Sequence, residues 1–185
     1  MRRYRSVIAQ RFSAVGWTCT FHETKPNEDL CAVVRTYCAG GVRRVVAVGG
    51  DGTIGEIVNG LVGTTVPLGI VPLGTGNLLA LGIGIPRRLE DAIDLLVKTS
   101  HTIGLDTMQM AGRHFVLNIG TGISSASIRD TRTADKRRFG ILAYAWRVIG
   151  HLFNFRSYRF ELELDGDQHT VRATEVLVSN GAILE

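Results

Sequence analysis

The chain has 185 residues, 45% of them hydrophobic, and carries a formal net charge of +4. This apolar content suffices for a packed core and argues against a disordered chain, while the length predicts one domain and part of another. The positive charge favours weak attraction to anionic surfaces. Because the basic residues are scattered without interleaved aromatic residues, we expect no nucleic-acid partner.

Cysteines and histidines give no sign of a metal centre. Cys19, Cys31 and Cys38 lack C-x-x-C spacing, so we expect free thiols, as in a cytoplasmic protein. The five histidines lie apart and form no recognised catalytic pattern. The basic residues 1–5 are not followed by the apolar core of a signal peptide. We therefore expect a cytoplasmic location.

Residues 1–100 alternate between helical and strand patterns. The predicted order is helix, strand, helix, strand, loop, helix, strand, loop and helix, which indicates a parallel sheet covered by helices. The first of these strands ends before Thr24. The second helix covers 28–39, with Asn27 as its N-cap and Gly40-Gly41 at its end.

The most informative stretch is the glycine-rich run Gly49-Gly50-Asp51-Gly52-Thr53. A buried strand is predicted over 45–48, and apolar residues at helical spacing follow over 54–61. Glycines let a ligand approach the backbone closely, and a helix N-terminus attracts anions, so this order suggests phosphate binding. A carboxylate repels phosphate, so Asp51 suits a Mg²⁺ network or a sugar hydroxyl better. The structural alternative is a turn in which Asp51 caps the helix.

A second glycine-rich loop follows the next predicted strand, residues 66–71. It contains Gly74-Thr75-Gly76-Asn77, and a helix is predicted to follow. Both loops would lie at the carboxyl edge of one parallel sheet, where such sheets bind ligands. Thr75 and Asn77 would add a hydroxyl and an amide, or one of them would simply cap the helix. The P-loop motif is absent, and this loop lacks the third glycine of the dinucleotide fingerprint.

Taken together, Gly49–Thr53, Glu56, Asn59-Gly60 and Pro72–Asn77 resemble the diacylglycerol kinase catalytic domain. That family includes bacterial diacylglycerol kinases, related lipid kinases and sphingosine kinases, and it shares its glycine loop with NAD kinases. The order and spacing of the two motifs carry the resemblance, which runs from about Thr24 to the C-terminus.

The resemblance implies ATP and Mg²⁺ as cofactors. The glycine loop, Gly49–Gly55, would wrap the nucleotide phosphates, and Asp51 would be linked to Asp106 through water and Mg²⁺. Asn118 also fits a family pattern, but no role follows for it. The implied nucleotide-binding residues are Thr24, Gly49, Gly50, Asp51, Gly52, Thr53, Ile54, Gly55, Thr75 and Asn77.

The chain also departs from the family pattern. The N-P-x-S-G loop is absent, Gly55 stands where asparagine is usual, and Leu78 where aspartate is usual. The general base of the family lies in a later part of the second domain, beyond Glu185, so no catalytic residue is assigned. We expect a fragment or a divergent member that binds nucleotide weakly at best and transfers no phosphate by itself.

A domain boundary is predicted at Ser100-His101, between an α/β nucleotide-binding domain, 1–100, and an incomplete β-rich domain, 101–185. Two hairpins are predicted in the second domain, together with one helix. The first hairpin pairs 103–110 with 114–120, and the second pairs 157–164 with 170–179 around Asp165-Gly166-Asp167. An open edge at 170–179 would favour a homo-oligomer.

Two segments bear on membranes. Residues 57–86 carry no charge, but polar residues and prolines interrupt them, so we expect sheet core and a ligand loop there. Lys136-Arg137-Arg138 precede an aromatic-rich stretch, 141–153, which would either rest on anionic lipid or pack between domains.

The sequence thus predicts a lipid kinase, ATP-dependent and peripheral to the inner membrane face, that phosphorylates the hydroxyl of diacylglycerol or a related lipid. The alternatives are an NAD kinase-like enzyme and a non-catalytic nucleotide- or lipid-binding module.

Overall fold

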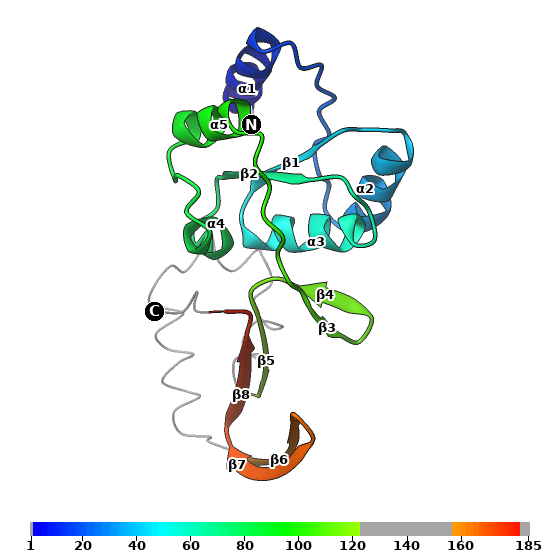
Figure 1. Cartoon of the computed structure of the whole chain (residues 1–185), viewed down its shortest axis with the longest axis vertical. Helices are drawn as coiled ribbons and strands as arrows, with labels where there is room; N and C mark the ends of the chain where they lie inside the picture. The colour runs from blue at the N-terminus through cyan, green and yellow to red at the C-terminus, as the bar shows by residue number, and fades with distance from the viewer. Residues whose placement is uncertain (1, 123–156, 182–185) are drawn as a thin grey trace. The chain divides into compact units, whose positions relative to one another are not determined.

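The computed structural model describes residues 2–122 and 157–181 (Figure 1). It divides into two compact units, Met1–Leu117 with Ser179–Glu185, and Asn118–Val178. The helices are α1 (Arg2–Ala14), α2 (Leu30–Ala39), α3 (Asp51–Leu61), α4 (Leu78–Gly82) and α5 (Leu89–Lys98). The strands are β1 (Val45–Gly49), β2 (Leu68–Pro72), β3 (Met108–Met110), β4 (Arg113–Phe115), β5 (Asn118–Gly122), β6 (Tyr158–Leu164), β7 (Asp167–Ala173) and β8 (Glu175–Ser179).

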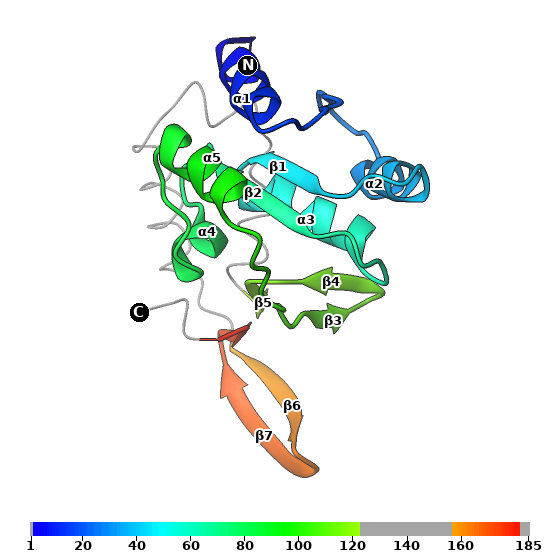
Figure 2. The ribbon, with the colours of Figure 1, turned by 45° about the horizontal axis from the view of Figure 1, so that its top comes forward.

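The first unit is built on a parallel pair of strands, as the sequence predicts. β1 pairs with β2 in a register that runs from Val45–Leu68 to Gly49–Pro72, so both strands end level with each other. Their alternating side chains enter two apolar clusters. Ala47 and Ile70 belong to the cluster with α2, α3 and α4, whereas Val71 belongs to the cluster with α1 and α5. Helices therefore cover both faces of the pair (Figures 1 and 2).

The start of α2 differs from the prediction. The N-cap is Asp29, whose Oδ1 accepts a hydrogen bond from the N–H of Ala32 at 3.0 Å. Asn27 instead adopts a left-handed conformation, with φ +62°, in the turn that precedes the helix. Gly40 follows the last residue of the helix and Gly41 turns left-handed, as expected.

The strand expected before Thr24 is not formed. Within the described chain, residues 17–25 adopt neither helix nor strand. The segment is held by its aromatic side chains: Trp17 packs on Phe12 of α1, and Phe21 joins the same cluster. Packing replaces strand pairing here, which a pattern of apolar residues does not reveal.

A hairpin of β3 and β4 is clamped to α3. The side chain of Asn59 donates to the carbonyl of His114 at 2.9 Å and accepts from its N–H at 2.8 Å. Glu56 forms an ion pair with Arg113. The turn at Ala111-Gly112 has positive φ at both residues, which suits a two-residue hairpin. Glu56 and Asn59 of the glycine-loop motif thus hold the first unit together.

The second unit contains the other predicted hairpin, with a correction. β6 and β7 are antiparallel across the turn Asp165-Gly166, where both residues have positive φ. The strand predicted over 170–179 is divided at Thr174, because β8 pairs with β5 instead. The strand predicted over 114–120 is likewise divided into β4 and β5.

No helix in the described part of the chain is both long and apolar enough to cross a bilayer. The uncharged residues 57–86 are shared among α3, β2 and α4, as predicted. The basic segment 136–138 and the stretch 141–153 lie outside the described residues. The domain boundary at Ser100-His101 stays a prediction.

Candidate functional site

The two glycine-rich loops meet beyond the ends of β1 and β2. The carboxylate of Asp51 accepts hydrogen bonds from the N–H groups of Leu78, at 3.1 Å, and Leu79, at 3.2 Å. The N–H of Leu73 donates to the carbonyl of Gly49 at 2.9 Å. Asp51 therefore does act as a helix cap, but for α4 rather than for its own helix, and in doing so it ties the two loops together.

Glycines allow the backbones of the two loops to approach each other closely. A Cβ built on Gly74 would lie 2.5 Å from the Cα of Gly50, so no side chain fits between the two loops. Gly52 and Gly55 behave differently, because a Cβ on either would have no heavy atom within 4 Å. Gly52 lies in the first turn of α3 and needs no left-handed conformation. Its missing side chain leaves space open to solvent.

Asn77 closes the second loop. It adopts a left-handed conformation, φ +54°, and is only 4% exposed. Its side-chain oxygen accepts from the N–H of Gly74 at 2.9 Å, and its amide nitrogen donates to the carbonyl of Gly74 at 2.8 Å. Asn77 thus occupies the N-cap position of α4, but its side chain holds the loop and leaves the capping to Asp51.

The start of α3 faces a pocket of about 250 Å³. The first hydrogen bond of the helix runs from the N–H of Ile54 to the carbonyl of Gly50 at 3.1 Å. The N–H groups of Gly52 and Thr53 precede that bond and have no acceptor within the helix. Thr24 lines the same pocket, whose lining residues are Thr24, Lys25, Glu28, Leu30, Gly52, Thr53 and Glu56. The arrangement suits an anion.

Other predicted residues support this pocket without lining it. The side chain of Ile54 is buried in the core, so only its backbone lies at the loop. Gly49 lies against Thr53: a Cβ on Gly49 would be 3.1 Å from the Thr53 side chain. Thr75 is exposed on the second loop. Gly55 lies in α3, about one helical turn after Gly52.

The two predicted metal residues, Asp51 and Asp106, make other contacts in the structure, and their link through Mg²⁺ stays a prediction. Both carboxylate oxygens of Asp51 already accept backbone hydrogen bonds. The backbone carbonyl of Asp106 accepts from the side chain of Asn180 at 2.6 Å. Among the described residues, no three His, Cys, Asp or Glu side chains come together as a metal site.

Lys25 and Glu28 line the pocket but are absent from the predicted site. Oε2 of Glu28 is 3.0 Å from Nε2 of His22 and accepts a hydrogen bond from the N–H of Lys25 at 3.1 Å. These hydrogen bonds, first that with His22, hold the pKa of the Glu28 carboxyl below its ordinary value. In the sequence, an acid three residues after Lys25 indicates a turn in which the acid accepts the N–H of Lys25. The sequence does not indicate that this turn lies beside the glycine loop, because that depends on the fold.

Comparison with known proteins places these features in a family. The family model of the diacylglycerol kinase catalytic domain matches residues 1–110. A diacylglycerol kinase of Bacillus subtilis (strain 168) is 30% identical over 173 residues, covering 89% of this chain and 55% of that protein. A Yersinia pestis (strain Pestoides F) protein named "Probable lipid kinase YegS-like" is 36% identical over 113 residues, covering 59% of this chain and 38% of that protein.

Solved structures agree. A crystal structure of a diacylglycerol kinase from Bacillus anthracis str. Sterne has a TM-score of 0.74 and 25% identity, covering 97% of this chain and 59% of that one. The chain thus spans about half the length of the relatives that it matches. From the match over residues 1–110 and the paired glycine loops, the chain belongs to the diacylglycerol kinase catalytic domain family.

Proposed function

We propose that this chain carries the nucleotide-binding site of an ATP-dependent lipid kinase. The observation that supports it most is the junction of the two loops, in which Asp51 caps α4 and Gly50 touches Gly74. The junction fixes the backbone around the open pocket at Gly52 and Thr53. The triphosphate would lie against these N–H groups, where the missing Cβ of Gly52 leaves room for it.

Mg²⁺ fits this site only as a companion of the nucleotide. It keeps several waters and is usually held by one or two carboxylates together with substrate phosphates. Asp51 and Asp106 would each supply a carboxylate to the hydrated ion, Asp106 through a water molecule. The nucleotide phosphates would supply further ligands, because no three protein ligands come together in the described residues. When bound, Mg²⁺ supplies charge neutralisation for the transferred phosphoryl group.

The chemistry we propose is transfer of the γ-phosphoryl group to a lipid hydroxyl. The chain's contribution would be positioning: the joined loops would orient the phosphates, and Thr24 would contact the nucleotide from the lining of the same pocket. We further propose diacylglycerol or a related lipid at a membrane surface as the substrate, a cytoplasmic location with peripheral attachment, and self-association. The names of the relatives do not favour the NAD kinase alternative or a non-catalytic module.

Nucleotide titration and label transfer test the proposal. The chain should bind Mg·ATP saturably in calorimetry, and radiolabel from ATP, where transferred, should appear in diacylglycerol, sphingosine or ceramide. Label in NAD would select the NAD kinase alternative. A chain that binds no ATP would contradict the proposal at its first step.

A further inference from the structure

Among the residues that line the proposed nucleotide pocket, Lys25 is the one with a cationic side chain. It follows Thr24 on the loop between α1 and α2, and both residues line the pocket together with Gly52 and Thr53. In the part of the chain that the structure describes, no ion pair joins Lys25 to an acid. Its ammonium group is thus available to a ligand in the pocket.

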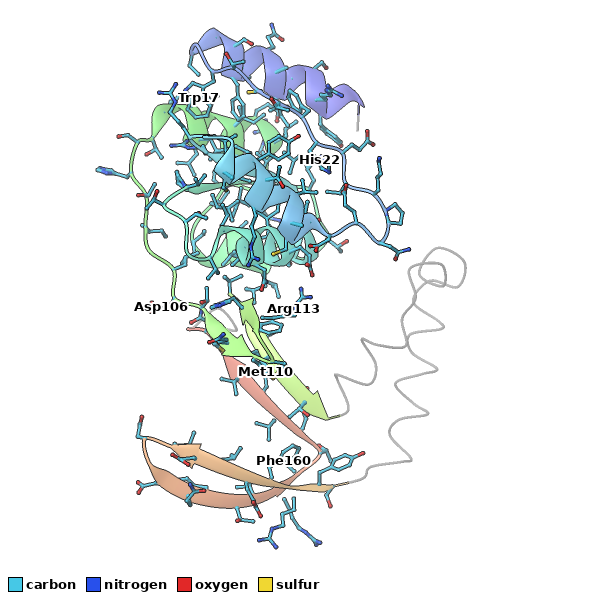
Figure 3. All side chains as sticks on the ribbon, turned by 90° about the vertical axis from the view of Figure 1, so that its right-hand side faces the viewer. Trp17, His22, Asp106, Met110, Arg113 and Phe160 are labelled. Carbon is cyan, nitrogen blue, oxygen red and sulfur yellow. The ribbon has the colours of Figure 1, made fainter. Side chains whose placement is uncertain are left out.

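Glu28 holds this loop in place. Its Oε2 accepts the N–H of Lys25 at 3.1 Å and lies 3.0 Å from Nε2 of His22, so one carboxylate oxygen fixes both sides of the turn. The backbone closes the same turn, because the N–H of Glu28 donates to the carbonyl of Lys25 at 3.3 Å. The ring of His22, which is labelled in Figure 3, packs edge-on against Tyr37 of α2, with ring centroids 6.2 Å apart. This contact anchors the turn to the helix.

The two acids of the pocket are balanced by partners. Glu28 is hydrogen-bonded to His22, and Glu56 on α3 forms an ion pair with Arg113 from β4. Because Arg113 offsets the charge of Glu56, and the carboxylate of Glu28 is engaged in hydrogen bonds, Lys25 is the charged residue of the lining that attracts phosphate. The charge of Lys25 also acts on Glu28, and it contributes to the lowered pKa of that carboxyl.

From this geometry we propose that Lys25 binds the terminal phosphates of the nucleotide, and that Glu28 is the positioning residue that keeps Lys25 at the pocket. The inference rests on the proposed function and names a residue for it. An ammonium group binds phosphate as a point charge, so its contribution should grow with the number of phosphates.

Affinities for AMP, ADP and ATP, measured by calorimetry on the full chain, test the role of Lys25. In Lys25→Gln, ATP should bind about tenfold more weakly while AMP binding changes little, since a charge-assisted contact of this kind is lost. Lys25→Arg should retain most of the ATP affinity. Lys98→Gln, which removes a lysine that does not line the pocket, should bind all three nucleotides as the wild type does.

The role of Glu28 is tested by a double-mutant cycle. Glu28→Ala should lower the ATP-to-AMP affinity ratio about as much as Lys25→Gln, and the double variant should lower it no further. Glu23→Ala, an exposed acid on the same loop, is the matched control. If Glu28→Ala fails to fold, Glu28→Met gives the same comparison, because it removes both hydrogen-bond acceptors and keeps a similar size.

The outcomes separate the two proposals. A wild-type chain that binds ATP, with an unchanged ATP-to-AMP ratio in Lys25→Gln, overturns the role of Lys25 and leaves the nucleotide site standing. Additive losses in the double variant overturn the positioning role of Glu28. A wild-type chain that binds no nucleotide overturns the proposed function itself.

Discussion

Gly50 and Gly74 lie in contact where the two loops cross, and this contact decides which side chains each position accepts. A Cβ on Gly74 would approach the Cα of Gly50 to 2.5 Å and Oδ1 of Asn77 to 2.7 Å. Neither neighbour can move away easily, because Asp51 holds one loop to the other and Asn77 closes the second. The glycine is therefore required by packing, independently of any ligand.

This contact predicts opposite results for two glycine-to-alanine variants. Gly74→Ala should lower the free energy of unfolding by roughly 1–3 kcal/mol, because backbone must shift to admit the methyl group. Gly52→Ala should keep or raise stability by up to about 1 kcal/mol, because alanine favours helix and its Cβ meets open space. ATP affinity should fall in both. Urea unfolding and nucleotide titration measure the two quantities.

The pair separates packing from binding. If Gly52→Ala binds ATP as tightly as the wild type, the phosphates do not lie against the first turn of α3. If Gly74→Ala is as stable as the wild type, the loops are less tightly joined than the Gly50 contact indicates.

At the scale of single residues, the sequence predicted that Asp51 has a special role, and the structure shows which backbone groups its carboxylate contacts. Asp51 is a helix cap, as one interpretation held, but for a helix that begins 27 residues later in the chain. Cap patterns are local, so they point to the adjacent helix, and only the fold brings α4 to this carboxylate. Lys25 was missed for the same reason: no local pattern tells that its turn faces the glycine loop.

Among the elements, α1 and α5 are joined by charge as well as by apolar packing. Asp94 of α5 accepts hydrogen bonds from Arg11 of α1 at 3.0 Å and from Lys98 at 2.8 Å. The bond from Lys98, with the charge of Arg11, holds the pKa of the Asp94 carboxyl below its ordinary value of 3.8. A carboxyl with a lowered pKa stabilises the fold while it is ionised and loses that contribution on protonation.

We therefore predict a measurable acid dependence from Asp94. Its contribution should be complete near neutral pH and should disappear as the pH falls from about 5 through the lowered pKa. Wild-type urea midpoints should fall over this range more steeply than those of Asp94→Asn. Lys98→Gln should have an intermediate slope, because it removes the larger cause and leaves Arg11. Equal slopes in all three proteins would show that the bonds of Asp94 with Arg11 and Lys98 do not contribute to the free energy of unfolding.

Elements with a strong local pattern were predicted well, and those defined by a partner were not. The helix over 54–61, the strand over 66–71 and the turn at Asp165-Gly166 follow from apolar spacing or from turn residues. The continuous strand over 170–179 was wrong because strand-forming residues lie on both sides of Thr174, where the chain changes partner from β6 to β5. The periodicity of a sequence predicts that a strand forms, but it does not predict which strand it pairs with.

On the scale of the whole molecule, the two compact units divide the proposed tasks unequally. The paired loops, the pocket and the residues that hold them all belong to the unit of residues 1–117 and 179–185. A lipid kinase also has to reach a substrate that stays in a membrane. The strongest basic cluster in the sequence, Lys136-Arg137-Arg138, lies outside the described residues, so its membrane role remains a prediction from sequence.

Vesicle sedimentation tests that role. Replacing Lys136, Arg137 and Arg138 with glutamine should weaken binding to vesicles rich in phosphatidylserine by roughly 100-fold at low salt, given about 1 kcal/mol for each basic residue near an anionic surface. The difference should shrink near physiological salt, where charges are screened beyond about 8 Å.

The matched control removes as many charges from the start and end of α5, as Arg87→Gln, Arg88→Gln and Lys98→Gln. If both triple variants lose binding equally, net charge alone attracts the protein to the membrane. A loss confined to the first variant assigns the contact to 136–138, because only the position of the removed charges then differs.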